Sequence, residues 1–433
     1  MTDPTIIRIR GRRIWDSRGR PTVEAEVQLA GGAIGRAIAP AGASRGTHEA
    51  IDLRDGGSKL GGLDVARAVA NVNGEIAQRL AGMTATDQAA VDAALIALDG
   101  TPNKARLGGN ATIAVSMAVL HAAAASCGEA LWSYLAGGKT ARLPLPEIQI
   151  FGGGAHAGRR VDIQDFMVMA LSATTFDEAL VMTAEVYRAA GQLMSDAGKL
   201  AGVADEGGFW PLFESNEEAL SVLTRAIEKA GYRPGDEVAI SLDIAASEFG
   251  RDGRYTLGLD QRELDRDGMI AMLLDWCRRY PVASIEDPLA EDDAEGMRAF
   301  TAAVGGRIQI IGDDYLVTNA DRVRAAAADR ACNAVLIKPN QAGTVTETRA
   351  ALEAGKAAGF GTIVSARSGE TEDVTIVHLA TGWDAGQLKV GSFTRSERMA
   401  KWNEALRLEE SLGATAHFAG RTVLPAGAGQ PLR

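Results

Sequence analysis

Several apolar stretches in the second half of the chain each end in a charged or polar side chain. These side chains are Asp243, Glu286, Asp313, Lys338, Arg367 with Ser368, and Lys389. Except for the longer first interval, neighbours in this series are separated by the length of one strand and one helix. In a closed α/β barrel the carboxyl ends of the strands face one mouth, where active sites of this fold lie. The pattern therefore predicts that these side chains meet at one site.

Three of these side chains are carboxylates on successive strands, and they would repel one another unless a cation lay between them. An all-oxygen ligand set without His or Cys favours Mg²⁺ over zinc. The alternative is that Asp243, Glu286 and Asp313 each cap the following helix. Three such acids in sequence favour the metal site.

The two lysines suggest proton chemistry. Lys338 follows the acids and Lys389 comes two strands later. A lysine that faces a cation and a second ammonium has its charged form disfavoured, so a neutral Lys338 is expected as a base. Its target would be a C–H acid next to a carboxylate, because a bound metal stabilises the resulting enolate. The alternative is a surface lysine at a strand end.

Arg367 and Ser368 close the stretch "GTIVSARSGETED". A guanidinium can hold a phosphate or carboxylate at two points, and a hydroxyl can donate beside it. The pair is therefore expected to bind the anionic group of a substrate. A structural ion pair of Arg367 with Glu370 or Glu372 is the alternative.

Eight short apolar segments alternate with amphipathic helical segments after residue 145, which is the number of strands that a closed α/β barrel needs. They begin with "EIQIFG" and "DFMVMAL", which are joined by the short loop 153–164 and followed by two helical stretches. The others are "VAISLD", "VASIED", "IQIIGDD", "AVLIKPN", "TIVSARS" and "QLKVG". The predicted fold class is α/β, with a barrel that opens ββαα.

The first part of the chain has a different pattern. Residues 6–38 alternate apolar and polar side chains between glycine turns, which predicts a three-stranded antiparallel meander. Ala- and Leu-rich helical stretches follow to about residue 135. Glycines and prolines in "GGKTARLPLP" interrupt both patterns. We therefore expect an α+β domain over residues 1–138 and the barrel over 139–433.

Bulk composition narrows the function class. The 433 residues carry a net charge of −11, and no segment concentrates Lys and Arg as a nucleic-acid partner would require. The first residues lack the apolar core of a secretory signal, so a cytoplasmic protein is expected. The Ala-rich stretch 111–126 is interrupted by polar residues and predicts a buried helix, not a membrane span. Cys127, Cys277 and Cys332 are far apart, which favours reduced thiols.

Ordered motifs along the whole chain resemble the enolase family. They include "WDSRGRPTVEAEV", "PAGASRGTHEAIDLRDG", "VDIQDFM", "ADEGGF", "SLDIAASEF", "YPVASIEDPLAEDD", "IGDDYLVTN", "LIKPNQAGTVTET" and "GQLKVGSFTRSERMAKWN". The resemblance implies an α+β domain before a barrel that opens ββαα, a homodimer or higher oligomer, and two Mg²⁺ ions per site. It also implies a small anionic phospho-carboxylate substrate. A pairing of Lys with Mg²⁺ is a known pattern of this superfamily.

The resemblance implies roles for the matched residues. Asp243, Glu286 and Asp313 match the ligands of the first metal, and Ser44, in "GASRG", matches the residue that brings in the second. Lys338 matches the base that removes the C2 proton of a 2-phosphoglycerate-like acid, and Lys389 matches the lysine on its carboxylate. The remaining matches are Glu206 on the leaving C3 hydroxyl and, on the substrate, His156, Gln164, Arg367 and Ser368.

Several positions depart from the family. Ala366 stands where the family has His, and Asp165 stands where it has Glu, near the leaving group. The loss of one methylene draws that carboxylate back by roughly 1.5 Å, and a shift of about 1 Å can cost ~10²-fold in rate. Arg45, a further candidate for substrate binding, replaces a Thr in the closing loop, and Arg159 and Arg160 replace amides. These changes predict a wider, more basic pocket.

We compare three candidate functions for this chain. The first is an Mg²⁺-dependent lyase that forms phosphoenolpyruvate or a derivative. The second is a specialised paralogue resembling carboxyphosphonoenolpyruvate synthase of phosphonate antibiotic pathways, whose substrate is bulkier and carries more negative charge. The third is a non-catalytic binding protein with the same fold. The chain keeps Lys338, Lys389, Glu206 and the three strand-end acids. This argues against the third function, because a site without catalysis has no physical reason to keep buried like charges together.

Overall fold

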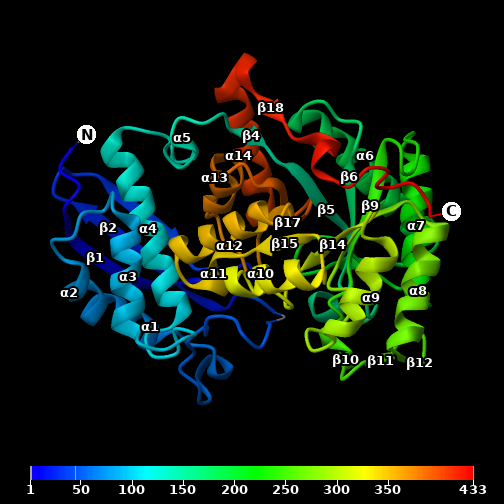
Figure 1. The fold of residues 1–433 in the computed structure, drawn as a ribbon, viewed down its shortest axis with the longest axis horizontal. Coiled ribbons are helices and arrows are strands. Elements are labelled where there is room, and N and C mark those ends of the chain that lie inside the picture. Colours follow the sequence, from blue (N-terminus) through cyan, green and yellow to red (C-terminus); the bar gives the residue numbers. More distant parts are fainter. Residues whose placement is uncertain (1, 44, 433) are drawn as a thin grey trace.

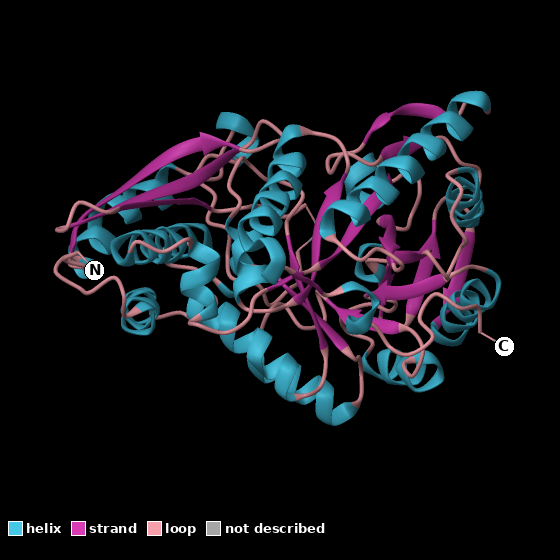
Figure 2. Cartoon of the chain, turned by 90° about the horizontal axis from the view of Figure 1, so that it is seen from above, coloured by secondary structure: helices cyan, strands magenta, loops and turns pink. Residues whose placement is uncertain are grey.

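The chain folds into an N-terminal part built of one small sheet and several helices, followed by a closed barrel (Figure 1). A computed structural model describes residues 2–43 and 45–432. Seen from above, the small sheet lies at the end of the molecule near the N-terminus, and the barrel strands lie in the half that holds the C-terminus (Figure 2). This is the α/β architecture that the sequence predicts.

The N-terminal sheet has the strand order β1-β2-β3 and is antiparallel throughout, as the alternating pattern predicts. Its strands are β1 (Ile6–Trp15), β2 (Pro21–Leu29) and β3 (Ile34–Ile38). Arg12 lies opposite Glu24 and forms ion pairs with both Glu24 and Glu26 on β2. Cross-strand pairs of opposite charge help to fix this register.

Helix α4 (Gly109–Cys127) is the core of the N-terminal part. A Cβ atom on Gly35 of β3 would lie 2.1 Å from the backbone oxygen of Ala118, so glycine allows the sheet to approach the helix closely. The helix is long and apolar enough to cross a membrane, but 83% of its most apolar window is buried inside the protein. The prediction of a buried helix here is confirmed. Around it lie α1 (Ala66–Asn71), α2 (Ala77–Leu80), α3 (Gln88–Asp99) and α5 (Leu131–Ala136).

All eight predicted barrel strands are present. They are β5 (Leu145–Gly152), β6 (Asp165–Ala170), β9 (Val238–Asp243), β13 (Val282–Glu286), β14 (Gln309–Gly312), β15 (Ala334–Ile337), β16 (Gly361–Ser365) and β17 (Gly386–Ser392). Strand β6 is antiparallel to both β5 and β9, whereas the later neighbours are parallel and β17 pairs with β5 to close the barrel. Because α6 (Phe176–Asp196) and α7 (Asn216–Lys229) both follow β6, the barrel opens ββαα as predicted.

The helices that follow the later strands have their own capping residues. Asp265, Asp293, Asn319 and Thr344 accept backbone hydrogen bonds at the starts of α8 (Arg266–Arg279), α9 (Ala294–Val304), α10 (Ala320–Asp329) and α12 (Val345–Ala357). The strand-end acids therefore do not cap these helices, which removes the alternative explanation for them. The remaining helices are α11 (Pro339–Ala342), α13 (Thr375–Gly382) and α14 (Ser396–Leu412).

Several short strands carry no pattern that the sequence analysis could detect. They are β7 (Leu200–Val203), β8 (Phe209–Pro211), β10 (Gly250–Arg251), β11 (Arg254–Leu257), β12 (Arg262–Asp265), and β4 (Arg142–Leu143) with β18 (His417–Phe418). Segments of two to four residues show too little alternation to be predicted.

A domain boundary between residues 138 and 139, just before β4, stays a proposal.

The three cysteines are free thiols. Burial raises the pKa of both Cys277 and Cys332 to about 12. These two thiols are therefore inert packing groups, as the sequence analysis expects.

Candidate active site

The three strand-end acids meet at one mouth of the barrel. Asp243 and Glu286 are direct partners in the register of β9 and β13, and Asp313 directly follows the neighbouring strand β14. All three side chains are buried. Burial and the neighbouring charge of Asp243 raise the pKa of Glu286 well above its ordinary value. The cluster of these three acids therefore needs positive charge close by.

Lys389 supplies part of that charge from β17. Its Nζ lies 2.8 Å from Asp243 Oδ2, 2.8 Å from Glu286 Oε2 and 3.4 Å from Asp165 Oδ2. Burial lowers the pKa of Lys389, but the attraction of Asp243 and Glu286 outweighs it, so the net shift is strongly upward. Lys389 is a fixed cation in this arrangement.

Among the described residues, Lys338 pairs with one carboxylate, since its Nζ donates to Asp313 Oδ2. Burial lowers the pKa of Lys338, whereas Asp313 and then Glu286 raise it, and the net shift is upward. The pairing with Asp313 favours the ammonium in this arrangement, and the neutral Lys338 expected beside a bound cation stays a prediction. A neutral amine requires that another cation take over Asp313.

A small pocket opens beside these charges. Its wall includes every predicted catalytic residue and most of the predicted substrate-binding residues. Four buried polar atoms at or beside it have no hydrogen-bond partner among the described residues. These atoms are Asp165 Oδ2, Glu286 Oε1, His156 Nδ1 and Gln164 Oε1. Unsatisfied buried polar atoms are costly, so their concentration here indicates a site for a ligand or ion.

The donor set fits a hard divalent cation. Asp243, Glu286 and Asp313 offer carboxylate oxygens, of which Lys389 bridges the first two acids and Lys338 pairs with the third. Glu286 Oε1 has no hydrogen-bond partner among the described residues. Gln164 donates from Nε2 to Asp243 Oδ2 at 2.9 Å, so this predicted substrate-binding residue also supports an acid of the cluster. Oxygen ligands of this kind suit Mg²⁺.

Two further acids and a histidine also line the pocket. His156 Nδ1 lies 3.4 Å from Glu206 Oε1 and 3.9 Å from Asp165 Oδ1. Burial raises the pKa of Asp165 to about 6, whereas burial of Glu206 is outweighed by His156 and Arg398, which lower its pKa. Two carboxyls whose pKa values diverge are suited to acid and base roles at one site.

Arg367 and Ser368 lie at the end of β16 and line the pocket. Arg367 pairs through its guanidinium with Glu49, at 2.9 Å and 3.1 Å, and also donates to Asn340 Oδ1 at 3.1 Å. Ser368 Oγ lies 3.3 Å from His156 Nε2. The alternative partner Glu370 instead accepts from the backbone N–H of Arg367.

Residues 6–135 match the family model described as "Enolase, N-terminal domain", and residues 140–426 match "Enolase, C-terminal TIM barrel domain". A curated relative named "Enolase 1", from Desulfitobacterium hafniense (strain Y51), is 49% identical over 421 residues, which cover 96% of this chain and 96% of the relative. The chain belongs to the enolase family. Within that family it is an enolase-superfamily lyase.

Some predicted residues of this enolase-family chain are not gathered at the pocket. Ser44 lies outside the described residues, and Arg45 is exposed and does not line the pocket. Arg159 pairs with Glu248 at 2.9 Å, and the Arg160 guanidinium lies over the ring of Trp210. The expected increase in positive charge at the pocket is not seen at positions 159 and 160, because partners outside the pocket hold these side chains.

Other residues that shape the site were missed by the sequence analysis. Asp287 accepts the backbone N–H groups of Asp313 at 2.9 Å and Asp314 at 2.7 Å, from a left-handed backbone (φ 39°). Its position directly after Glu286 was the available signal. Glu49, the partner of Arg367, lies 318 residues away and gave no such signal.

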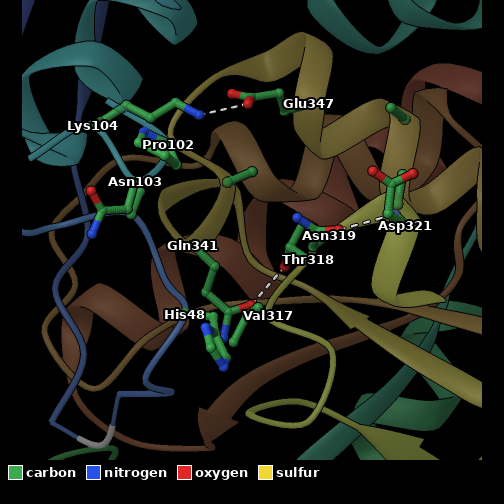
Figure 3. A pocket seen from close by; sticks show the side chains of 14 residues that line it. His48, Pro102, Asn103, Lys104, Val317, Thr318, Asn319, Asp321, Gln341 and Glu347 are labelled. Atoms are coloured by element: carbon green, nitrogen blue, oxygen red, sulfur yellow. Dashed lines mark hydrogen bonds and ion pairs between the residues drawn. The ribbon is translucent and has the colours of Figure 1, made fainter. Parts of the chain in front are cut away.

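A second pocket of this enolase-family fold lies between the N-terminal part and the barrel (Figure 3). Lys104 pairs there with Glu347 at 2.5 Å. Gln341 accepts from Thr318 Oγ1 at 2.6 Å and donates to Asp313 Oδ1 at 2.8 Å. Gln341 thus joins this pocket to the acid cluster.

Proposed function

We propose that this lyase removes the C2 proton of a 2-phosphoglycerate-like acid, expels the C3 hydroxyl and releases an enolpyruvyl product. The observation that carries the proposal is that two amines, Lys338 and Lys389, line one pocket together with the acids Asp165 and Glu206, and that both amines pair with strand-end acids. Proton removal and loss of a hydroxyl need a base and an acid at one site.

Asp243, Glu286 and Asp313 are the residues that would hold Mg²⁺, and Ser44 is the candidate for a second ion. When bound, the ion would supply positive charge that stabilises the enolate, in which the substrate carboxylate carries an additional negative charge. The substrate class is a small carboxylate that also bears a phosphoryl or phosphonyl group. Lys389 would face its carboxylate, and Arg367, Ser368 and His156 would bind the other anionic group.

Lys338 is the better base of the two amines. Its ammonium pairs with one acid, whereas Lys389 lies within ion-pair distance of three, so Lys338 loses its proton more readily. The C2 proton passes to Lys338 Nζ, and the electron pair forms the C2–C3 double bond as the C3–O bond breaks. The pair Glu206 and Asp165 provides the proton that converts the leaving hydroxyl to water.

The test is an assay of purified protein with 2-phosphoglycerate and Mg²⁺, in which phosphoenolpyruvate is followed by its ultraviolet absorbance. Activity that EDTA and Lys338→Ala abolish, while the exposed-site control Lys229→Ala retains it, supports the proposal. Neither product nor exchange of the C2 proton with solvent, in an Mg²⁺-loaded and folded sample, would overturn it for this substrate.

A second candidate, a paralogue resembling carboxyphosphonoenolpyruvate synthase, is favoured by the small side chain of Ala366 in the pocket wall. A methyl group there leaves room for a bulkier anion. Supply of an activated phosphonoformate should then give a new phosphorus resonance for the enolpyruvyl product. Rapid turnover of 2-phosphoglycerate without that resonance favours the first candidate.

The homodimeric or higher state and the cytoplasmic location stay predictions from the family resemblance. Light scattering of the purified chain measures the first, and a particle at the mass of one 45.3 kDa chain would contradict it. Cell fractionation measures the second.

A further inference from the structure

We propose that Gln149 is a positioning residue. It holds the carboxylate of Asp165 and the loop of Glu206 in the relative position that loss of the leaving group requires. The inference rests on the proposed function, because it assigns Gln149 to the elimination half of that reaction. Nothing in the motifs of the chain points to this residue, which lies on β5 and is fully buried.

The side-chain amide of Gln149 links the two elements. Its Nε2 donates to Asp165 Oδ1 on β6, and its Oε1 accepts the backbone N–H of Gly208 at 2.8 Å. Gly208 comes two residues after Glu206. One amide group therefore fixes the distance between the strand that carries Asp165 and the loop that carries Glu206.

The backbone of Gln149 is tied to the same loop by a second route. Its carbonyl oxygen accepts from Ser392 Oγ at 2.5 Å, and the backbone N–H of Ser392 donates to the carbonyl oxygen of Glu206 at 2.9 Å. The position of Gln149 is thus fixed at both its backbone and its side chain, so a change of the side chain alone should affect Asp165 first.

Two glycines close the space around the amide. A Cβ on Gly208 would lie 2.4 Å from Gln149 Oε1. A Cβ on Gly152 would lie 2.6 Å from the Cβ of Ala204 and 3.4 Å from Gln149 Nε2. Because the amide oxygen must accept from Gly208, the NH₂ group must face Asp165, and the orientation is set by the hydrogen bonds. The residue is therefore held in one rotamer.

This contact leaves the other oxygen of Asp165 available. Oδ2 has no hydrogen-bond partner among the described residues and lies 3.4 Å from Lys389 Nζ, at the pocket. An acid with one oxygen anchored and the other directed to a ligand is arranged for proton transfer at a defined point. Gln149 contributes the anchor and itself does not line the pocket.

Side-chain length makes the pair specific. Asp165 is a short acid that a long amide reaches from the neighbouring strand. Asp165→Glu alone would push the carboxylate into Gln149, and Gln149→Asn alone would leave a gap of about one methylene, ~1.5 Å. The two changes together restore the summed length, so the double variant should recover part of what each single variant loses.

The experiment compares Gln149→Leu, Gln149→Asn, Asp165→Glu and the double variant Gln149→Asn with Asp165→Glu. The reference is Gln192→Leu at an exposed position. Each Mg²⁺-loaded protein is assayed with 2-phosphoglycerate for C2 proton exchange with deuterated solvent, which reports Lys338, and for phosphoenolpyruvate formation, which also needs Glu206 and Asp165. Thermal unfolding confirms that each variant is folded.

We expect Gln149→Leu to lower kcat for product formation by about 10- to 100-fold, with KM and C2 exchange changed less than about threefold. The double variant should be faster than either of its single variants. Equal loss of exchange and product formation, unchanged kcat, or multiplicative effects in the double variant would overturn the inference.

A substrate-independent measurement keeps this test separate from the proposed function. If the unmodified protein shows neither exchange nor product, the proposed function fails, and a crystal structure of Gln149→Leu decides about Gln149. Displacement of the Asp165 carboxylate or of the loop at Gly208 supports its positioning role. An unmoved carboxylate and loop contradict it.

Discussion

Arg367 and Glu49 form a buried two-point ion pair that joins the end of a barrel strand to the N-terminal part. The Arg367 Nη1 atom lies 2.9 Å from Glu49 Oε2, and Nη2 lies 3.1 Å from Oε1. Burial lowers the pKa of Arg367, but Glu49 outweighs it and raises that pKa. The arginine proposed to bind the anionic group of the substrate is therefore oriented by an acid from another part of the chain.

The first prediction concerns that ion pair. Glu49→Ala leaves a buried guanidinium without its main counter-charge, and loss of one partner of a buried pair costs about 3–5 kcal/mol. The midpoint of urea unfolding should fall accordingly, and Glu49→Gln should cost less because it keeps an acceptor. Glu228→Ala, at an exposed position, is the control. A midpoint for Glu49→Ala equal to the control would show that the pair does not stabilise the fold.

The second prediction is a pH effect at Glu147, which faces the barrel interior. Burial raises its pKa to about 7, although Lys389 and the hydrogen bond from Ser241 act to lower it. The folded state then binds this proton more tightly than the unfolded state. The stability contribution is complete below the unfolded pKa near 4.5 and is lost as pH rises through about 7.

Glu147→Gln removes this titration while it keeps the shape of the side chain. Relative to the unmodified protein, we expect the variant to gain on the order of 2–3 kcal/mol in free energy of unfolding between pH 5 and pH 8. Urea titrations at several pH values measure this, with Glu263→Gln as an exposed control. A constant difference between variant and parent across that range would contradict the prediction.

The third prediction concerns Asp92, a buried acid where the N-terminal part meets α12. It accepts from Ser116 Oγ at 2.6 Å, and from the backbone N–H and hydroxyl of Thr346 at 2.8 Å and 2.6 Å. Asp92→Ala leaves these donors unsatisfied, and we expect a loss of about 1–3 kcal/mol. Thermal unfolding against Asp267→Ala, an exposed change, measures it. A melting temperature that falls for Asp267→Ala and not for Asp92→Ala would contradict the prediction.

The fourth prediction concerns metal binding. If Asp243, Glu286 and Asp313 hold Mg²⁺, then Mg²⁺ at 100 times its Kd should stabilise the protein by about 2.7 kcal/mol. The melting temperature should rise with Mg²⁺ and fall again with EDTA. Glu286→Gln should weaken this dependence, whereas Glu295→Gln, at an exposed side chain, should keep it. Equal Mg²⁺ dependence in both variants would exclude Glu286 as a ligand.

The fifth prediction uses Ala366, which occupies a position where the resemblance to the family implies His. Ala366→His adds an imidazole to the pocket wall and reduces its volume. If the space serves a bulkier anion, kcat/KM for that substrate should fall at least tenfold, by about 1.4 kcal/mol in transition-state binding. The rate with 2-phosphoglycerate should fall less or rise. Parallel losses on both substrates would contradict a selective role of this position.

Much of the site could be predicted because its residues end buried strands. Asp243, Glu286 and Lys338 are conspicuous against the apolar runs that precede them, and the barrel brings strand ends together. The supporting residues carry no such contrast. Gln149 lies within a strand, and Glu49 lies in an N-terminal loop, so their partners became known only from their contacts.

The sequence by itself determined the eight-stranded barrel, its ββαα opening and the acids and amines at its mouth, because local periodicity and strand order suffice for these. Tertiary structure alone decided the pairing of Lys338 with Asp313, the outward pairing of Arg159 and the Gln149–Asp165 contact. Charge and position at a buried site depend on distances between atoms remote in sequence, which no local pattern encodes.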